Sequence, residues 1–285
     1  MKKLALTISF ILALSPIAYS QISDLEKSAL LDLYKSTKGQ TWNTNWDLSK
    51  DASSWNGITV ENNAVTEINL SMNNLTGPIP ATIGNLTSLR HLNLGFNKIS
   101  GTIPSELATI ESLVTVQLFM NQLEGQIPAA IGNLKNLKEL VLFNNFISGN
   151  LPESIYDIAS LEILHLSSNN LSGIISPAIK NLHLLKTLSL FDNTMNGMLP
   201  KQIGDLTNLT ELSLANNSFE GTIPAEFSKL SKLETLLLIN NKFTGQISPS
   251  IKNLPKLLNF EYNNNDVEVS SKYSNPITQV VLISQ

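Results

Sequence analysis

The chain has 285 residues, of which 42% are hydrophobic and 15% are charged, and its formal net charge at pH 7 is −4. The acidic residues are scattered and the sequence has no basic patch, which argues against nucleic acid as a partner. Because the sequence contains no cysteine, it excludes disulfides, thiol catalysis and zinc–thiolate sites.

The first twenty residues have the pattern of a secretory signal peptide. Two lysines precede an apolar run over residues 4–14, and a small-x-small cleavage site at residues 18–20 precedes Gln21. A membrane anchor is the alternative, but the run is too short to span about 30 Å of hydrocarbon, and a Ser-Pro pair interrupts it. We therefore expect residues 1–20 to be removed. The product would be secreted or held at the cell surface, or periplasmic in a bacterium, and would not span the membrane.

Residues 21–63 are expected to form an N-terminal cap that begins with a short amphipathic helix. Ser23 and Glu26 have the spacing of a capping box, in which each side chain bonds a backbone N–H of the other residue. Gly39 is the expected end of the helix. The apolar side of the helix is expected to consist of Leu25, Ala29, Leu30, Leu33 and Tyr34.

All three tryptophans of the chain, Trp42, Trp46 and Trp55, follow in a polar, turn-rich segment. Tryptophans can stack against a ligand, but the open end of a stack of repeats also exposes its core and needs a cover. We interpret the three tryptophans as part of the cap.

An asparagine recurs every 24 residues in one frame of apolar positions. A fixed period of this length predicts a solenoid, in which each unit packs only on its neighbours and the core runs through the stack. Nine repeats occupy residues 64–269. We number them one to nine by their asparagines: Asn73, Asn97, Asn121, Asn145, Asn169, Asn193, Asn217, Asn241 and Asn265.

Each repeat is expected to form one coil of the solenoid. In the second repeat, Leu92-Asn93-Leu94 alternates and predicts a short strand with both leucines inward. Asn97 is expected to be buried at the turn that follows and to bond backbone groups there, so that stacked coils form an asparagine ladder. Gly101 permits a tight bend, the Ile-Pro after it leaves the bend extended, and a short helical or irregular return completes the coil.

Some repeats and the C-terminal end depart from this pattern. The fifth and eighth repeats move the proline one place on, to Pro177 and Pro249, and the ninth replaces leucines by Phe260 and Tyr262. Terminal repeats are commonly atypical because they meet solvent. Residues 270–285 are apolar enough to form a C-terminal cap with a closing strand; a truncated or fused chain is the alternative.

The pattern L-x-x-L-x-L-x-x-N-x-L-x-G-x-I-P resembles the plant-type leucine-rich repeat, and residues 209–224 (LTELSLANNSFEGTIP) fit it closely. The likeness extends over about residues 64–265, and residues 29–31 and 55–60 are similar to the N-terminal cap of that family. Plant members usually carry paired cysteines in the cap, so this cysteine-free chain looks more like secreted versions found in bacteria. The resemblance implies a right-handed α/β solenoid with a concave parallel β-sheet. It also implies recognition, as in receptor ectodomains and plant inhibitors of wall-degrading enzymes.

No catalytic constellation is expected. His91 and His165 lie three repeats apart, roughly 14 Å at the strand spacing, so they cannot share a metal ion. Asp192 and Glu211 lie near opposite ends of adjacent strands, roughly 16 Å apart, which exceeds the separation of glycosidase carboxylates. Because the sequence also lacks a phosphate loop and a nucleophile motif, we expect neither an enzyme nor a cofactor or metal site.

The concave face is the expected binding surface. Phe119 and Phe143 occupy equivalent positions on adjacent strands, so their rings should lie within roughly 5 Å and stack. An exposed apolar strip bordered by polar groups is typical of an interaction site, although such rings can also serve only to cover the sheet. The candidate partner-binding residues are Phe96, Phe119, Met120, Glu139, Val141, Phe143, His165, Phe191, Asp192, Leu237 and Ile239.

The sequence therefore favours a monomeric, secreted or cell-surface protein that binds an extracellular protein, peptide or glycan. A structural or adhesion protein is the second hypothesis. Its ice-binding variant predicts regular rows of threonine, whereas the concave rows are mixed. A carbohydrate-active enzyme is the third. A thermal-hysteresis assay and a glycan array would separate the three hypotheses.

Overall fold

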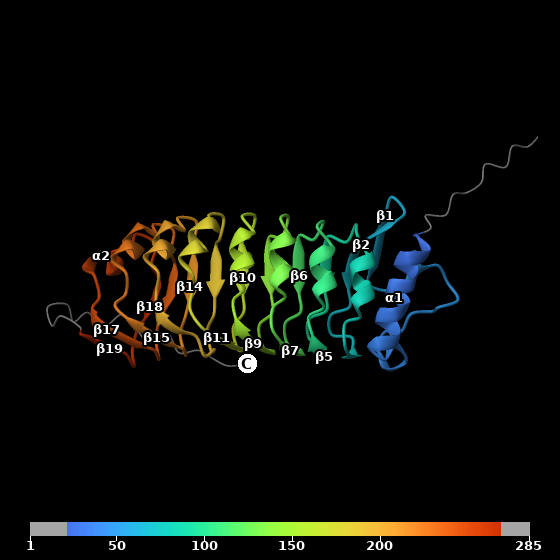
Figure 1. The fold of residues 1–285 in the computed structure, drawn as a ribbon, viewed down its shortest axis with the longest axis horizontal. Coiled ribbons are helices and arrows are strands. Elements are labelled where there is room, and N and C mark those ends of the chain that lie inside the picture. Colours follow the sequence, from blue (N-terminus) through green and yellow to red (C-terminus); the bar gives the residue numbers. More distant parts are fainter. Residues whose placement is uncertain (1–21, 269–285) are drawn as a thin grey trace, which may run out of the picture.

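The computed structural model describes residues 22–268, which form a row of stacked coils with a helix at one end (Figure 1). The expected signal peptide, residues 1–20, and the expected C-terminal closing segment, residues 270–285, lie outside the described residues. Within the described part of the chain, no helix has both the length and the apolar character that a membrane crossing requires.

Helix α1 (Asp24–Ser36) belongs to the N-terminal cap and begins with the predicted capping box. The Ser23 hydroxyl accepts the N–H of Glu26, and one carboxylate oxygen of Glu26 accepts the N–H of Ser23. The other carboxylate oxygen accepts the N–H of Val65 at 2.9 Å. This second bond joins the helix to the first repeat, and it explains why so polar a side chain is buried.

Two details predicted for the helix are wrong. Leu25 does not lie on the apolar side, because it is 67% exposed. Gly39 does not end the helix: α1 stops at Ser36, and the chain reverses at Lys38, whose φ of 56° is left-handed. Gly39 is needed for another reason, since a Cβ at this position would lie 2.2 Å from the ring of Tyr34.

The three tryptophans form a buried aromatic stack. Trp46 lies between Trp42 and Trp55, with ring-centroid distances of 5.0 and 4.7 Å. Each indole N–H donates to a backbone carbonyl within residues 37–56, and all three rings belong to the core. The prediction that they are part of the cap and not an exposed ligand platform is confirmed. Two short 3-10 helices, η1 (Gly39–Thr41) and η2 (Ala52–Ser54), complete this region.

One ten-stranded sheet, the main sheet, runs along the whole stack. Its repeat strands are parallel, and each residue pairs with the residue 24 positions further on, as Leu164 does with Leu188. The cap adds strand β1 (Ile58–Glu61), which pairs antiparallel with the first repeat strand and covers the N-terminal edge. The repeat strands are β2 (Ala64–Asn69), β4 (His91–Asn93), β6 (Thr115–Gln117), β8 (Glu139–Val141), β10 (Ile163–His165), β12 (Thr187–Ser189), β14 (Glu211–Ser213), β16 (Thr235–Leu237) and β18 (Asn259–Glu261).

A second line of short strands, not anticipated from the sequence, contains most of the repeat glycines. Gly101 has a φ of 78°, which confirms the predicted bend and which glycine adopts without strain. The strands form a five-stranded and a four-stranded parallel sheet. They are β3 (Thr76–Gly77), β5 (Lys98–Thr102), β7 (Gln122–Gly125), β9 (Phe146–Asn150) and β11 (Asn170–Ser172), followed by β13 (Asn196–Met198), β15 (Ser218–Gly221), β17 (Lys242–Gln246) and β19 (Asp266–Glu268).

The return segments of repeats one to seven are 3-10 helices of five residues each. Such a segment is less than two turns long, and short 3-10 pieces are frequent as connectors between other elements. They are η3 (Ala81–Asn85), η4 (Ser105–Thr109), η5 (Ala129–Asn133), η6 (Glu153–Asp157), η7 (Pro177–Asn181), η8 (Lys201–Asp205) and η9 (Ala225–Lys229). Repeat eight has the short α-helix α2 (Pro249–Lys252) instead.

The asparagine ladder is confirmed, and it joins neighbouring coils. Asn169 donates through Nδ2 to the carbonyls of Leu166 and Leu142, both at 3.0 Å, and its Oδ1 accepts the N–H of Ile147 at 3.0 Å. Leu142 and Ile147 belong to the preceding repeat. Each ladder asparagine from Asn97 on therefore closes its own turn and satisfies backbone groups of the coil before it, whereas Asn73 bonds Thr44 of the cap.

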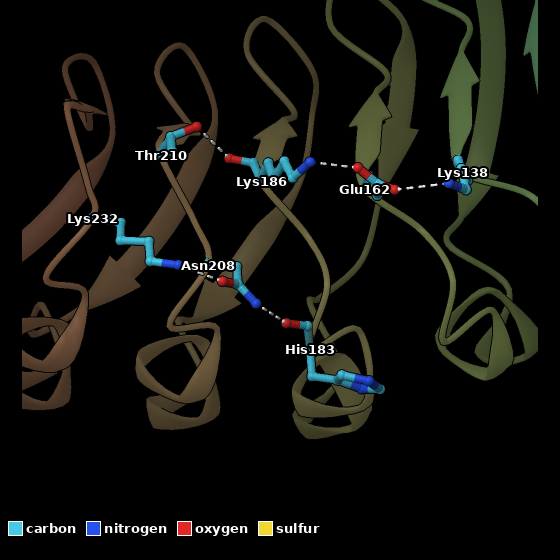
Figure 2. Close-up of polar contacts among 7 residues, drawn as sticks. All are labelled: Lys138, Glu162, His183, Lys186, Asn208, Thr210 and Lys232. Carbon is cyan, nitrogen blue, oxygen red and sulfur yellow. Dashed lines mark hydrogen bonds and ion pairs between the residues drawn. The ribbon is translucent and has the colours of Figure 1, made fainter.

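Polar side chains also link the repeats along the flank where the returns lead into the main sheet (Figure 2). Glu162 lies between Lys138 and Lys186, with N···O distances of 3.4 and 2.5 Å, and the hydrogen bond from Lys186 lowers the pKa of the Glu162 carboxyl. Asn208 donates to the carbonyl of His183 at 2.9 Å. The lysines shown on this flank thus bond groups of neighbouring repeats: Lys138 and Lys186 pair with Glu162, and Lys232 donates to Asn208.

Candidate binding face

The outward side chains of the main sheet form the concave face. In each repeat they are the residues six, four, two and one positions before the recurrent asparagine, as Glu139, Val141, Phe143 and Asn144 are before Asn145. The strand residues between them point inward and are buried. The residue immediately before each asparagine has a left-handed φ, which places its side chain at the outer end of the strand.

Four rings are in contact on this face, and we call them the ring strip: Phe96, Phe119, Phe143 and His165. Phe119 and Phe143 stack with centroids 4.9 Å apart and planes 12° apart, which confirms their predicted contact. Phe143 stacks on His165 at 4.5 Å, and Phe96 meets Phe119 edge-on at 5.3 Å. The strip therefore crosses repeats two to five without a gap.

Gly95 supports the ring strip from below. A Cβ at this position would lie 2.6 Å from Cζ of Phe119, so the ring rests directly on the glycine backbone. Phe119 and Phe143 are consequently half-buried, whereas Phe96 at the outer end keeps 46% of its surface exposed. This role of Gly95 could not be predicted from the sequence, because the glycine is not part of the repeat pattern.

Phe96 and Met120 hold a costly backbone conformation. Their φ angles are 54° and 51°, in the left-handed region that favours glycine and asparagine. Asparagine does occupy the equivalent position in repeats four, seven, eight and nine. Apolar residues in this conformation, beside the stacked rings, are a local deviation of the kind that often accompanies a functional surface.

Beyond His165 the concave face changes character. Ser167 and Ser189 occupy outward positions of the face, but both are buried, and their hydroxyls lie 2.7 Å apart. Ser213 and Ala215 in repeat seven are buried as well. These small side chains lie below the level of their larger neighbours on the face. The row of apolar side chains expected to extend to Phe191 is therefore interrupted after repeat five.

Four of the candidate residues lie in repeats beyond the ring strip. Phe191 and Asp192 belong to repeat six, and among the described residues no ring contact joins Phe191 to the strip. Leu237 and Ile239 are half-buried in repeat eight. Met120 and Val141, also half-buried, belong to the repeats that contain Phe119 and Phe143. Of the eleven candidates, the structure thus brings four into the ring strip, which are Phe96, Phe119, Phe143 and His165.

The concave face carries carboxylates but no lysine or arginine in any of the nine repeats. Its acidic residues are Glu67, Glu139, Asp192, Glu211 and Glu261. Burial raises the pKa of the Glu211 carboxyl and lowers the pKa of the His165 imidazole. No group of three or more potential metal ligands occurs among residues 22–268.

A row of surface asparagines, also missed in the sequence, lies at the outer end of the last strands. Asn240 Nδ2 donates to Asn216 Oδ1 at 2.6 Å, and Asn264 Nδ2 donates to Asn240 Oδ1 at 2.7 Å. The left-handed turn position recurs in register, so identical amides stack from repeat to repeat.

Comparisons with known proteins agree with this geometry. A leucine-rich-repeat model matches residues 159–219, and a second one matches residues 64–86, 88–110, 136–158 and 232–254. No curated protein sequence matches the chain.

Several solved structures are similar. The structure of PEPR1–AtPEP1 is 34% identical over 85% of this chain and 35% of that chain, with a TM-score of 0.77. The Arabidopsis receptor kinase HAESA, solved with the peptide hormone IDA and the co-receptor SERK1, is 31% identical over 86% of this chain and 42% of that chain (TM-score 0.77). A plant ice-binding protein is 25% identical over 87% of this chain and 81% of that chain (TM-score 0.77). The chain thus spans about a third of the first of these structures and most of the last.

Proposed function

Because the chain belongs to the leucine-rich-repeat family, as its matched repeats and its fold show, we propose that it binds a peptide or an exposed protein segment outside the cytoplasm. The ring strip on the concave face carries this proposal. Stacked, half-exposed rings offer a large apolar contact area at little cost in side-chain entropy, and such areas are typical of the centres of binding interfaces.

Two further observations support the proposal. Phe96 and Met120 retain a strained conformation beside the strip, although asparagine would relieve it. The similar receptor HAESA was solved with a bound peptide hormone. The extracellular location rests on the signal-peptide pattern of residues 1–20 and on the likeness to receptor structures. We propose binding without catalysis and a monomeric state.

Selection from a random peptide display library tests the proposal. Peptides enriched on the protein should lose at least about tenfold in affinity, or about 1.4 kcal/mol, when Phe119→Ser and Phe143→Ser are combined. The matched control is Phe146→Ser, because Phe146 is equally aromatic and 58% exposed but lies in β9, outside the main sheet. This control should bind as the unchanged protein does.

Circular dichroism and thermal melting of the double variant complete the test. Both should stay close to those of the unchanged protein. If the double variant unfolds, the two rings belong to the core and the proposed site is wrong. Equal loss in the Phe146→Ser control would mean that the selected peptides bind exposed aromatic surface in general, which also contradicts the proposal.

Ice binding is the second candidate, and the likeness to a plant ice-binding protein of similar extent favours it. The surface row Asn216–Asn240–Asn264 supplies in-register polar groups. A thermal-hysteresis measurement distinguishes the two functions. Ice binding is favoured over peptide binding if the activity is lost in the Asn240→Lys variant and kept in the Phe119/Phe143 double variant.

A further inference from the structure

The concave face is anionic because of where the charges lie and not because of composition. The chain has 19 basic and 23 acidic residues, so the two signs are nearly balanced overall. Yet lysine and arginine are absent from the concave positions, while five carboxylates occupy them. Basic residues lie on other surfaces, as Lys138 and Lys186 do on the flank shown in Figure 2. A partner docked on the concave face therefore meets negative charge alone.

Three of these carboxylates share one row. Strand register places Glu67, Glu139 and Glu211 at the same strand position, with three strand steps between successive carboxylates. At about 4.8 Å per step, the backbone positions of neighbouring carboxylates are about 14 Å apart. An extended chain advances about 3.4 Å per residue, so four residues cover the same distance. Residues i and i+4 of an extended chain also point to the same side.

The carboxylates of this row are not neutralised by the protein. Glu139 accepts one hydrogen bond, from Gln117 at 3.2 Å, and Glu67 accepts one from Thr59 at 3.3 Å. Glu211 is half-buried and receives no hydrogen bond from any described side chain. Every ion pair among residues 22–268 lies outside the concave face. A cation from a partner would supply the missing interaction in a partly desolvated place, where it is stronger than in water.

The ring strip adds apolar contact area and no charge of its own. Phe143 stacks on both Phe119 and His165, so its faces are covered by neighbouring rings and the strip can pack against the uncharged side chains of a partner. His165, the basic side chain within the strip, has a pKa lowered by burial and so adds no positive charge at neutral pH.

We infer that the occupant of the concave face is a cationic polypeptide segment, bound in extended form across the strands, with basic side chains four residues apart facing Glu67, Glu139 and Glu211. The inference rests on the proposed function and specifies the chemistry of the partner. Binding by a neutral glycan is the competing outcome.

Two synthetic peptides of twelve residues test the inference by fluorescence anisotropy with the full chain. One carries arginine at its second, sixth and tenth residues and leucine or tyrosine between them; the other carries glutamate at those three places. The arginine peptide should bind at least about tenfold more tightly. Its affinity should fall steeply between about 0.05 and about 0.3 M salt, because screening weakens contacts between exposed charges. A third peptide, with arginines three residues apart, should bind more weakly than the first.

Matched variants locate the effect. Combining Glu139→Gln with Glu211→Gln should lower the affinity for the arginine peptide about tenfold. Combining Glu124→Gln with Glu220→Gln removes the same charge from exposed positions on β7 and β15 and should change the affinity less than about twofold. Equal binding of the two peptides, no binding of the arginine peptide, or equal effects of the two variant pairs would each overturn the inference.

The result also separates this inference from the proposed function. Suppose that library peptides depend on Phe119 and Phe143 but show no excess of arginine or lysine and no effect of Glu139→Gln. That result would support the proposed binding face and contradict the inference that its partner is cationic. If neither the rings nor the carboxylates affect peptide binding, both proposals fail. A glycan that binds through Phe143 and is indifferent to the carboxylates would identify the competing occupant.

Discussion

Phe119 rests on Gly95 of the preceding repeat so closely that a single added methyl group would lie 2.6 Å from its ring. Gly95 is buried, and its φ is not in the positive range where glycine is required for backbone reasons. The glycine is therefore needed for the space it leaves. It holds one ring of the ring strip at a fixed height above the sheet, and through stacking it sets the position of Phe143.

Replacing Gly95 by alanine should consequently displace the Phe119 ring while leaving the coil intact. We expect peptide binding at the ring strip to weaken at least about fivefold, roughly 1 kcal/mol, with little change in far-ultraviolet circular dichroism. Ser71→Ala, at the equivalent position of repeat one, is the control and should have no effect. Unchanged binding by the Gly95→Ala variant would show that the height of the ring is not important.

Asn169→Ala should destabilise the protein by about 1–3 kcal/mol, because it leaves the N–H of Ile147 and the carbonyls of Leu142 and Leu166 buried without partners. Asn170→Ala is the matched control, since the neighbouring side chain is exposed. Urea denaturation measures both free energies of unfolding. Equal midpoints for the two variants would contradict the assignment of the ladder.

Glu26→Ala should also be destabilising, by about 1–3 kcal/mol or more, because the N–H of Val65 loses its acceptor and the capping box is broken. Glu26→Gln keeps a carbonyl oxygen and should lose less. Asp24→Asn changes an exposed acid in the same helical turn and should have little effect. Hydrogen exchange at Val65 provides the local measurement: protection that persists in Glu26→Ala would refute the bond.

The free energy of unfolding should fall in strong alkali because of Tyr156. Burial raises the pKa of its phenol to about 12, while in the unfolded chain the pKa is about 10. The unfolded state therefore releases this proton first, so the stability that the neutral phenol contributes below pH 10 is lost as the pH rises from about 10 to about 12. At about 1.4 kcal/mol per unit over about two units, the loss is on the order of 3 kcal/mol.

Tyr156→Phe is the comparison that isolates this effect. It removes the oxygen that accepts the N–H of Ser176, so the variant should be less stable at neutral pH. The difference in unfolding free energy between the two proteins should shrink as the pH rises from about 10 to about 12, because only the unchanged protein loses the contribution of this phenol. A difference that stays constant over this interval would contradict the raised pKa.

Much of the fold could be predicted because one local rule is repeated. The period of the asparagines predicted the stack, and the alternation around Asn93 predicted which side chains face outward. Since parallel strands in register bring residues 24 positions apart side by side, the contact of Phe119 with Phe143 followed from the frame alone. The capping box at Ser23 was equally local and was found as predicted.

The errors concern residues whose surroundings come from other parts of the chain. Leu25 fits the helical period but lies where α1 has no neighbour. Ser167 occupies an outward position yet is buried, and its hydroxyl contacts that of Ser189 on the next repeat. Gly39 was interpreted as a helix end, whereas the ring of Tyr34 is what requires a glycine there.

The sequence by itself determined the register of the stack, the direction of the side chains in the main sheet and the ladder asparagines, because these depend on a hydrophobic frame that each coil repeats. Only the tertiary structure decided how far each outward side chain is exposed, where the ring strip ends and which carboxylates lack a partner. Exposure depends on the volumes of side chains one coil away, and charge pairing depends on distances between atoms of different coils. Neither quantity is fixed by the identity of a residue in its own repeat.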